Sequence, residues 1–335
     1  MIRANDVEIE NLERTYWSRK WKAIASDWRL YLMLVPLFFF LICWKYSPIG
    51  TMIMSFKNYN SSLQAYGSNW VGIYWFQQLM FGNMSTEFWR AFRNTFTLSF
   101  YGMIFGFPFP IILALLFSEI KCTGYRAVAQ VLCYLPKFVS TVVITSLTVL
   151  LLQQKVVDTA GNTLQHPGPI AQIFISITGN ENLTIMRDPR CFRAVYQVTG
   201  IWEAAGYGSI VYFAAILGIS PTNYEAARID GATKGQQVRY VTLPGITSTL
   251  VIMLILEIGK LLTIGYEKVI LLEGTTQDLY ETAETISTYV WHLQQGTSVN
   301  MGAGAAADMF NSVISMLLVI GSNQIAKKVS KTSLY

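Results

Sequence analysis

Long apolar stretches alternate with polar segments along this chain, and six of the stretches are long enough to cross a membrane. A membrane-spanning helix needs ~20 consecutive, mostly apolar residues. Proline inside such a helix, as at Pro108 and Pro110, is tolerated where neighbouring groups satisfy the freed backbone. The pattern therefore predicts an all-α polytopic membrane protein with six transmembrane helices. The six stretches lie at about 30–56, 94–117, 128–152, 194–218, 245–272 and 303–325.

The composition agrees with a membrane protein. Apolar residues make up 52% of the chain and charged residues only 13%, whereas a soluble domain carries about a quarter charged residues. The net charge of +5 gives no argument for nucleic-acid binding. The two histidines, His166 and His292, have no partner at metal-ligand spacing, so we expect no metal site and no cofactor bound by this chain.

The distribution of Lys and Arg predicts that both termini lie in the cytoplasm. With the N-terminus inside, the inner segments carry 14 of these residues and the outer loops carry 7. Cytoplasmic loops are the ones enriched in positive charge. The predicted organisation is a cytoplasmic N-terminal segment (1–29), a transmembrane domain (30–326) and a cytoplasmic tail (327–335).

The N-terminal segment contains aromatic residues at helical spacing, namely Trp17, Trp21 and Trp28, with Ile24 among them. One interpretation is an amphipathic helix that lies on the inner membrane surface. The other is a solvated leader whose tryptophans anchor at the interface. The sequence leaves both open.

A polar segment between the fourth and fifth apolar stretches predicts two short cytoplasmic helices. Ser220 and Pro221 form a good helix start, because a capping side chain precedes a proline at the first helical position. Gly231 can adopt a positive φ angle and end this helix. Thr233 can then cap a second helix that runs to Thr242, and the next span begins at the proline that follows.

The same segment carries small and charged residues that suit the docking of a partner. Small side chains let a groove in another protein approach the backbone closely, and charged side chains supply ion pairs. The small residues are Ala226, Ala227, Gly231 and Ala232, and the charged residues are Glu225, Arg228 and Asp230. An ordinary cytoplasmic loop with a helical turn is the alternative interpretation.

The spacing in this segment resembles a known signature. Glu225-Ala226-Ala227 is followed after three residues by Gly231, and after nine more by Val241, one residue and Leu243-Pro244. This pattern resembles the signature of the integral-membrane permease subunits of binding-protein-dependent ABC importers, where isoleucine usually stands in place of Val241. Further similar motifs are Asn94-Thr95, Gly106-Phe107-Pro108, Leu135-Pro136, Tyr266-Glu267-Lys268-Val269, Glu284 to Val290, Phe310 to Ile314 and the tail from Lys327.

The resemblance covers about residues 28–335 and is similar in particular to six-span permeases for complex oligosaccharides and polysaccharides, including alginate-type importers. It implies a type I ABC importer permease fold in the bacterial cytoplasmic membrane. It also implies a second, homologous permease subunit, two ATPase subunits that bind ATP and Mg²⁺, and an extracytoplasmic solute-binding protein. The partners would further include a carbohydrate substrate and membrane lipid, but no nucleic acid.

The resemblance assigns residues 221–243 as coupling helices that dock on the ATPase. The docking residues expected from it are Tyr224, Glu225, Ala226, Ala227, Arg228, Asp230, Gly231, Ala232, Leu243 and Pro244.

Polar and aromatic residues inside the spans predict a path for a sugar. Aromatic faces stack on pyranose rings, and charged residues within spans usually face a cavity or a partner. The candidates are Trp202, Glu203, Tyr207, Tyr212, Glu257 and Lys260. The alternative is structural, with interhelical packing, lipid-facing aromatics and an i,i+3 ion pair between Glu257 and Lys260. Lys137 stands where the family often has histidine.

Two other classes of protein compete with this interpretation. A stand-alone secondary transporter or channel for a polar solute would explain the spans, but not the docking signature. A membrane enzyme would need a catalytic motif, and the sequence contains no HExxH, no Gly-x-Ser-x-Gly and no Gly-rich phosphate loop. We therefore expect a permease subunit without a catalytic site, with ATP hydrolysed by a separate subunit.

Overall fold

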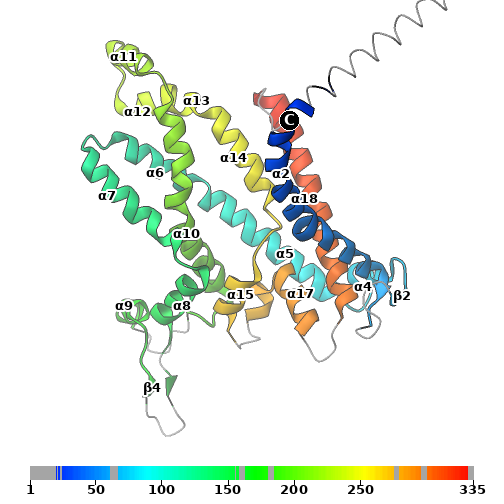
Figure 1. Cartoon of the computed structure of the whole chain (residues 1–335). Coiled ribbons are helices and arrows are strands. Elements are labelled where there is room, and N and C mark those ends of the chain that lie inside the picture. Colours follow the sequence, from blue (N-terminus) through cyan, green and yellow to red (C-terminus); the bar gives the residue numbers. More distant parts are fainter. Residues whose placement is uncertain are drawn as a thin grey trace, which may run out of the picture.

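The computed structural model of this chain is almost entirely helical (Figure 1). The residues that the structure describes are 20, 22, 25–60, 67–154, 156–157, 163–179, 185–274, 279–295 and 300–330. Trp17, Trp21 and Ile24, on which the two interpretations of the N-terminal segment depend, fall outside them, as do residues 331–335 of the tail. The chain is an all-α polytopic membrane protein, as the sequence predicts.

Four helical runs in the described part are long and apolar enough to cross a membrane, and two bent pairs bring the total to six if each pair is one span. The four runs are Trp28–Tyr46, Ser85–Glu119, Pro189–Leu217 and Met301–Lys328. The bent pairs are Thr123–Phe138 with Thr141–Leu152, and Lys234–Gly245 with Thr247–Gly259.

The first run joins α2 (Trp28–Phe40) to the π-helical η1 (Leu41–Tyr46), and the 3₁₀ helix η2 (Ser47–Phe56) follows. None of the side chains of α2 is buried. By contrast, η2 packs against the last helix, α18 (Met301–Ser330). The chain therefore covers η2 but leaves α2 open to its surroundings.

The second run starts earlier than predicted, because α5 (Ser85–Tyr101) extends the apolar stretch outward with an amphipathic end. It continues through the π-helix η3 (Gly102–Gly106) into α6 (Pro108–Glu119). Proline removes a backbone donor, and the wide π-helical turn stands directly before Pro108, the first residue of α6. The run thus passes Pro108 and Pro110 without a break.

The third predicted span is not one straight helix, so the expectation of a continuous helix at 128–152 was wrong. Helix α7 (Thr123–Tyr134) and the 3₁₀ helix η4 (Leu135–Phe138) meet α8 (Thr141–Leu152) at 96°. Pro136 lies in η4, and Ser140 caps α8 by accepting a hydrogen bond from the Val142 backbone N–H. Because a cap requires non-helical backbone, the chain turns there.

Helix α10 (Pro189–Leu217) is the fourth run and lies at the centre of the molecule, packed against α6, α7, η3 and η4. Gly206 allows its closest approach to α7, because a methyl group there would overlap the Cys133 carbonyl oxygen. This contact places α10 beside the break in the third span.

The fifth predicted span, 245–272, is also interrupted. Helix α14 (Thr247–Gly259) ends before a non-helical stretch at 260–265, and α15 (Tyr266–Glu273) follows. Glycine stands at both edges of the stretch, at Gly259 and Gly265, and it weakens a helix. A hydropathy window does not detect such a break, because the stretch remains apolar.

The remaining short elements lie mainly at the end of the molecule opposite α11 and α12 (Figure 1). They are α4 (Tyr74–Phe81), α9 (Pro169–Thr178), α16 (Tyr280–Ala283), α17 (Ile286–Gln295) and the antiparallel strand pairs β1–β2 (Lys57–Asn58, Asn69–Trp70) and β3–β4 (Val156–Val157, Thr163–Gln165). In β1–β2, Lys57 pairs with Trp70 and Asn58 with Asn69. We call this the outer end, after the orientation that the sequence predicts.

Candidate functional site

The first helix of the coupling segment forms where the sequence predicts it. Helix α11 (Pro221–Ile229) begins at the proline. The prediction that the Ser220 side chain caps this helix is wrong. The Ser220 hydroxyl forms a hydrogen bond with the Thr222 hydroxyl at 2.7 Å and none with the backbone of the first turn. Proline at the first position needs no donor partner, so the helix starts without the cap.

The turn between the two short helices depends on Gly231, whose φ angle is +76°. Side chains with a Cβ rarely adopt this conformation. Helix α12 (Lys234–Gln237) then begins with a capping box. The Thr233 side chain accepts from the Gln236 backbone N–H, and the Gln236 side chain accepts from the Thr233 backbone N–H. Both the turn and the cap confirm the sequence prediction.

The second helix runs further than predicted. Helix α12 continues through the π-helix η5 (Val238–Thr242) into α13 (Leu243–Gly245), and the 66° bend to α14 follows. Pro244 therefore lies within this run rather than at the start of the next span, and the wide turn of η5 precedes it. The coupling segment is therefore continuous with α13, and α14 follows after a single non-helical residue, Ile246.

Two side-chain contacts tie the coupling segment together and to the rest of the chain. The Tyr224 and Thr242 hydroxyls lie 3.1 Å apart and join α11 to η5. The Lys234 ammonium lies 2.7 Å from the Glu119 carboxylate at the end of α6. Movement of α11 and α12 would therefore be passed to both α6 and α14.

The charged residues predicted to dock on a partner are exposed. The side chains of Glu225, Arg228 and Asp230 make no hydrogen bond or ion pair with another described residue. Ile229, between them, is an exposed apolar side chain. Glu225 and Arg228 also line a cavity of about 310 Å³ between α11 and the ends of α6 and α10. The surface thus offers both signs of charge, an apolar residue and a hollow.

The six predicted path residues lie at three places around α10, and the structure does not bring them together. Glu203 and Tyr207 face the break in the third span. Tyr212 lines a groove with Glu257 and Lys260, and Trp202 lines a separate cavity.

The break in the third span holds a polar cluster around the Glu203 carboxylate. The Thr141 hydroxyl donates to Glu203 Oε1 at 2.9 Å, and the Lys137 ammonium lies 3.4 Å from the same oxygen. The ring of Phe138 meets that of Tyr207 edge to face, with centroids 6.0 Å apart. Sequence analysis did not assign Lys137, Phe138 or Thr141, although Pro136 and Ser140 mark the turn that brings them here.

The second place is a groove of about 390 Å³ between η3 and α6, α10 and α14. Glu257 and Lys260 pair across 3.1 Å, as their i,i+3 spacing predicts. Tyr212 is only 3% exposed, and its ring packs edge to face against Phe107. Tyr212 is therefore a core residue that also borders the groove.

The third place is an apolar cavity of about 670 Å³ between α8, α9 and α10. Trp202 lines it, together with aliphatic side chains of α8 and the Phe174 ring of α9. Few polar groups border this cavity, so it offers little to the hydroxyls of a sugar.

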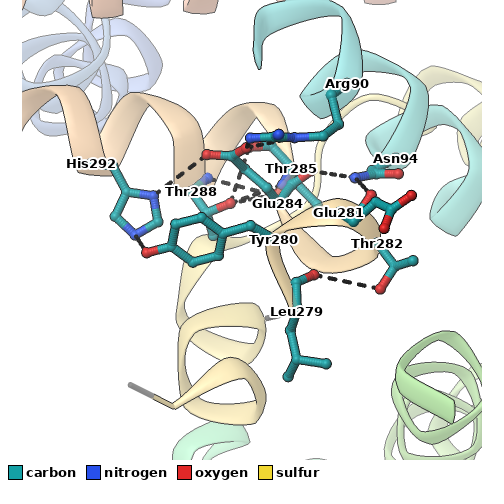
Figure 2. A network of polar contacts seen from close by, with 10 residues as sticks. All are labelled: Arg90, Asn94, Leu279, Tyr280, Glu281, Thr282, Glu284, Thr285, Thr288 and His292. Atoms are coloured by element: carbon teal, nitrogen blue, oxygen red, sulfur yellow. Dashed lines mark hydrogen bonds and ion pairs between the residues drawn. The ribbon is translucent and has the colours of Figure 1, made fainter. Parts of the chain in front are cut away.

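A buried charge network at the outer end was missed by the sequence analysis (Figure 2). The Arg90 guanidinium of α5 donates to Glu284 Oε2 through Nη2 at 2.6 Å and Nε at 3.2 Å. The Glu284 side chain is 6% exposed. His292 Nδ1 lies 3.8 Å from Glu284 Oε1, and the Tyr280 hydroxyl lies 3.4 Å from His292 Nε2.

The same network joins two motifs that lie far apart in the sequence. The Asn94 side-chain amide donates to the backbone carbonyls of Glu281 and Glu284, at 2.9 and 3.1 Å. The Ile286 backbone N–H donates to the Thr95 hydroxyl at 2.8 Å. Asn94-Thr95 and the segment that starts at Glu284 thus fasten the α16–α17 region to α5.

A second carboxylate near this network, Glu273, has a shifted pKa. Burial raises the pKa of Glu273 to about 7; His292 opposes the rise and the Glu284 carboxylate adds to it. The pKa of the Tyr280 hydroxyl is raised for the same main reason, burial, with Glu273 and Glu284 contributing. The outer end therefore contains groups that titrate in an unusual range.

The fold and these sites define a polytopic helical membrane protein of the transport class, with interrupted helices beside polar residues within the spans. No family model matches the chain. It is 33% identical over 316 residues to protein LplB of Bacillus subtilis, covering 93% of each chain. It is 34% identical over 308 residues to the polygalacturonan/rhamnogalacturonan transport system permease protein YteP of the same organism, covering 91% of this chain and 90% of YteP.

Solved structures agree with these relatives. One is a bacterial ABC transporter involved in the import of the acidic polysaccharide alginate, which matches with a TM-score of 0.80 and 35% identity over 93% of this chain and 99% of that one. A second is the alginate transporter in complex with an alginate pentasaccharide-bound periplasmic protein, with the same TM-score and identity over 94% of this chain and 99% of that one. The chain belongs to the family of permease subunits of carbohydrate ABC importers.

Proposed function

We propose that this chain is one of two permease subunits of an ATP-driven importer that translocates an oligosaccharide or polysaccharide delivered by an extracytoplasmic binding protein. The family assignment supports the transport of carbohydrate, and YteP is itself part of a transport system. The observation that carries the coupling role is the exposed pair of helices α11 and α12, on which Glu225 and Arg228 have no partner among the described residues. A stand-alone transporter or channel would have no use for such a surface.

The assembly proposed here contains a second homologous permease and two ATPase subunits, and ATP and Mg²⁺ bind only to the latter. It lies in the bacterial cytoplasmic membrane with both termini of this chain inside. The coupling segment and the C-terminal end of α18 lie at the same end of the molecule (Figure 1), which supports this orientation. The outer end would then face the binding protein.

In this proposal the coupling segment acts as a lever. The ATPase groove holds α11 and α12 through Glu225, Arg228 and the tight turn at Gly231. When the ATPases close, the bound helices move as one unit because the Tyr224–Thr242 contact joins them. The Lys234–Glu119 ion pair carries this motion to α6, and the short connection from α13 carries it to α14. The ATP-bound state then shifts the population between inward-open and outward-open forms.

The substrate path of this proposal passes the break in the third span. Irregular backbone at membrane depth is tolerated where it lines a cavity or is buried in protein. The Glu203 carboxylate and the Tyr207 ring lie beside that break, whereas Trp202 lines an apolar cavity and Tyr212 is almost fully buried. We therefore place Glu203 and Tyr207 in the path, and we expect Glu203→Ala and Tyr207→Ala to lower transport more than assembly.

The test of the docking role is copurification. The tagged chain is isolated gently from its native membrane, and the proteins that accompany it are identified, first for the wild type and then for Glu225→Arg. We expect a second multi-span subunit and an ATPase with the wild type, and loss of the ATPase alone with the variant. Glu225 is exposed, so the substitution leaves the fold intact.

Glu87→Arg is the matched control, because Glu87 is an exposed carboxylate in the first turn of α5, at the opposite end. It should retain both partners. Recovery of the wild-type chain alone, under conditions that keep known complexes intact, contradicts the importer proposal. Retention of the ATPase by Glu225→Arg contradicts the docking role.

A further inference from the structure

The break in the third span holds more positive than negative charge. Glu203 is the carboxylate at its centre, and Lys137 lies 3.4 Å away. A second lysine, Lys268 of α15, is buried nearby and interacts electrostatically with both. The Lys268 ammonium donates to the Tyr196 carbonyl at 3.2 Å and lies 4.6 Å from the centre of the Tyr196 ring. Two lysines therefore interact with this carboxylate, and of the two Lys137 is the one within ion-pair distance of it.

The Glu203 carboxylate is stabilised well without Lys137. The Thr141 hydroxyl donates to it at 2.9 Å, whereas the Lys137 ammonium lies 3.4 Å away. Thr141 is also the first residue of α8, and the N-terminus of a helix carries a partial positive charge that favours an anion. The Glu203 carboxylate therefore has favourable neighbours other than Lys137.

Lys137 in turn keeps donor capacity that the chain does not use. Its side chain is 43% exposed, whereas that of Glu203 is 10% exposed. An ammonium has three donors, and the contact with Glu203 is long for a charged hydrogen bond. The remaining donors face the open side of the break.

Aromatic rings flank this open side. Phe138, the next residue after Lys137, is 76% exposed, and Tyr207 is 48% exposed. Exposed rings of this kind offer faces on which the CH surface of a pyranose can stack. An ammonium next to exposed aromatic rings in the sequence and at the same break matches a sugar that carries a carboxylate, and a charge within a span is costly unless it meets a partner.

We propose that Lys137 is a specificity-determining residue, which binds a substrate carboxylate in the path and makes this permease prefer acidic over neutral oligosaccharides. The inference rests on the proposed function, because it assumes that the break lines the path. The names of two similar proteins refer to acidic polymers, polygalacturonan for YteP and alginate for the solved importer. In this chain, the Lys137 ammonium is the positive charge that would pair with the carboxylate of an acidic sugar.

The experiment measures binding of matched acidic and neutral sugars to the complete purified complex in lipid nanodiscs. The acidic probes are trisaccharides from polygalacturonate and from alginate, and each neutral probe is the same trisaccharide after reduction of its carboxyl groups. Equilibrium dialysis gives the affinities. The wild type should prefer at least one acidic probe to its reduced form about tenfold, a typical effect of one charge-assisted hydrogen bond.

Lys137→Gln should remove that preference by lowering only the affinity for the acidic probe, and Lys137→Glu should reverse it. Lys121→Gln is the matched control, because Lys121 is an exposed lysine in the segment between α6 and α7 and is not a candidate path residue. It should leave both affinities unchanged.

The inference is overturned by a wild-type complex that does not prefer either acidic probe. It is also overturned if the Lys137→Gln complex still prefers the acidic probe, or if the substitution lowers the affinities for the acidic and the neutral probe equally. These outcomes are distinct from failure of the proposed function, in which no complex with an ATPase is recovered at all.

Discussion

The two ends of this molecule treat their charged residues in opposite ways. At the end that carries the coupling segment (221–243), which we call the coupling end, Glu225 and Arg228 are exposed and have no partner among the described residues. At the outer end, Arg90 and Glu284 form a largely buried ion pair at 2.6 Å. Both ends contain motifs that resemble the same family. We conclude that a family motif whose charges are exposed and unpaired indicates a docking surface, whereas a buried, hydrogen-bonded motif indicates a structural role.

The largest expected effect that separates the two ends comes from the glycines in their turns. Gly231 in the coupling segment and Gly274 at the outer end both have positive φ angles, +76° and +63°, with open space around the Cβ position. Gly231→Leu should reduce carbohydrate uptake to background while the chain remains in the membrane, because a strained turn and a bulky side chain prevent docking. Gly274→Leu likewise places a side chain at a positive φ angle and should keep most of the uptake. Uptake by cells and immunoblots of their membranes provide the measurements, and normal uptake by Gly231→Leu contradicts the docking role.

The next effect concerns stability rather than transport. Arg90→Met leaves the Glu284 carboxylate buried without its principal partner, and removing one member of a buried pair costs about 3–5 kcal/mol. We expect a clear fall in melting temperature of the purified complex, with the ATPase still bound to the folded fraction. Arg93→Met is the control, because the exposed Arg93 side chain has no partner among the described residues and should change stability by less than about 0.5 kcal/mol. Equal melting temperatures of the two variants would show that the pair does not support the outer end.

The smallest effect is a pH dependence confined to the outer end. Burial raises the pKa of Glu273 to about 7, so the native chain holds its proton up to about that pH, whereas an unfolded glutamate releases it near its ordinary pKa of 4.5. The native state thus binds more protons in this window, so the contribution of Glu273 to stability is complete below pH 4.5 and is lost as the pH rises through 7.

Glu273→Gln is neutral at every pH and tests this point. Its melting temperature should exceed that of the wild type by a few degrees at pH 8 and equal it at pH 5. Melting curves at both values give the answer, and a difference that is the same at pH 5 and pH 8 contradicts the assigned titration.

Local signals in the sequence were enough to predict the coupling segment. Pro221, Gly231 and Thr233 each act through their own backbone and immediate neighbours, and the structure places a helix start, a positive φ angle and a cap at these residues. The Ser220 cap failed because a neighbouring hydroxyl competes for the same side chain.

The breaks in the third and fifth spans could not be predicted in the same way. Hydropathy measures composition, and it does not report the direction of the backbone. Pro136 and Ser140 were visible signals, but they lie within an apolar stretch. The grouping of path residues also failed, because helical spacing gives the face of α10 on which a residue lies but not the element that this face meets.

The outer network shows a further limit. Asn94 and Glu284 lie 190 positions apart, and only the folded chain brings the amide to that carbonyl. Sequence similarity marked both motifs without giving the contact between them.

The most direct test of the contrast between the two ends is hydrogen–deuterium exchange, with the chain compared in its purified complex and after the ATPase has been removed. We predict that ATPase binding slows exchange in α11, the Gly231 turn and α12, and leaves the amides around Asn94 and Ile286 unchanged. Equal exchange of residues 221–237 in the two samples would contradict the claim that this exposed segment is the docking element.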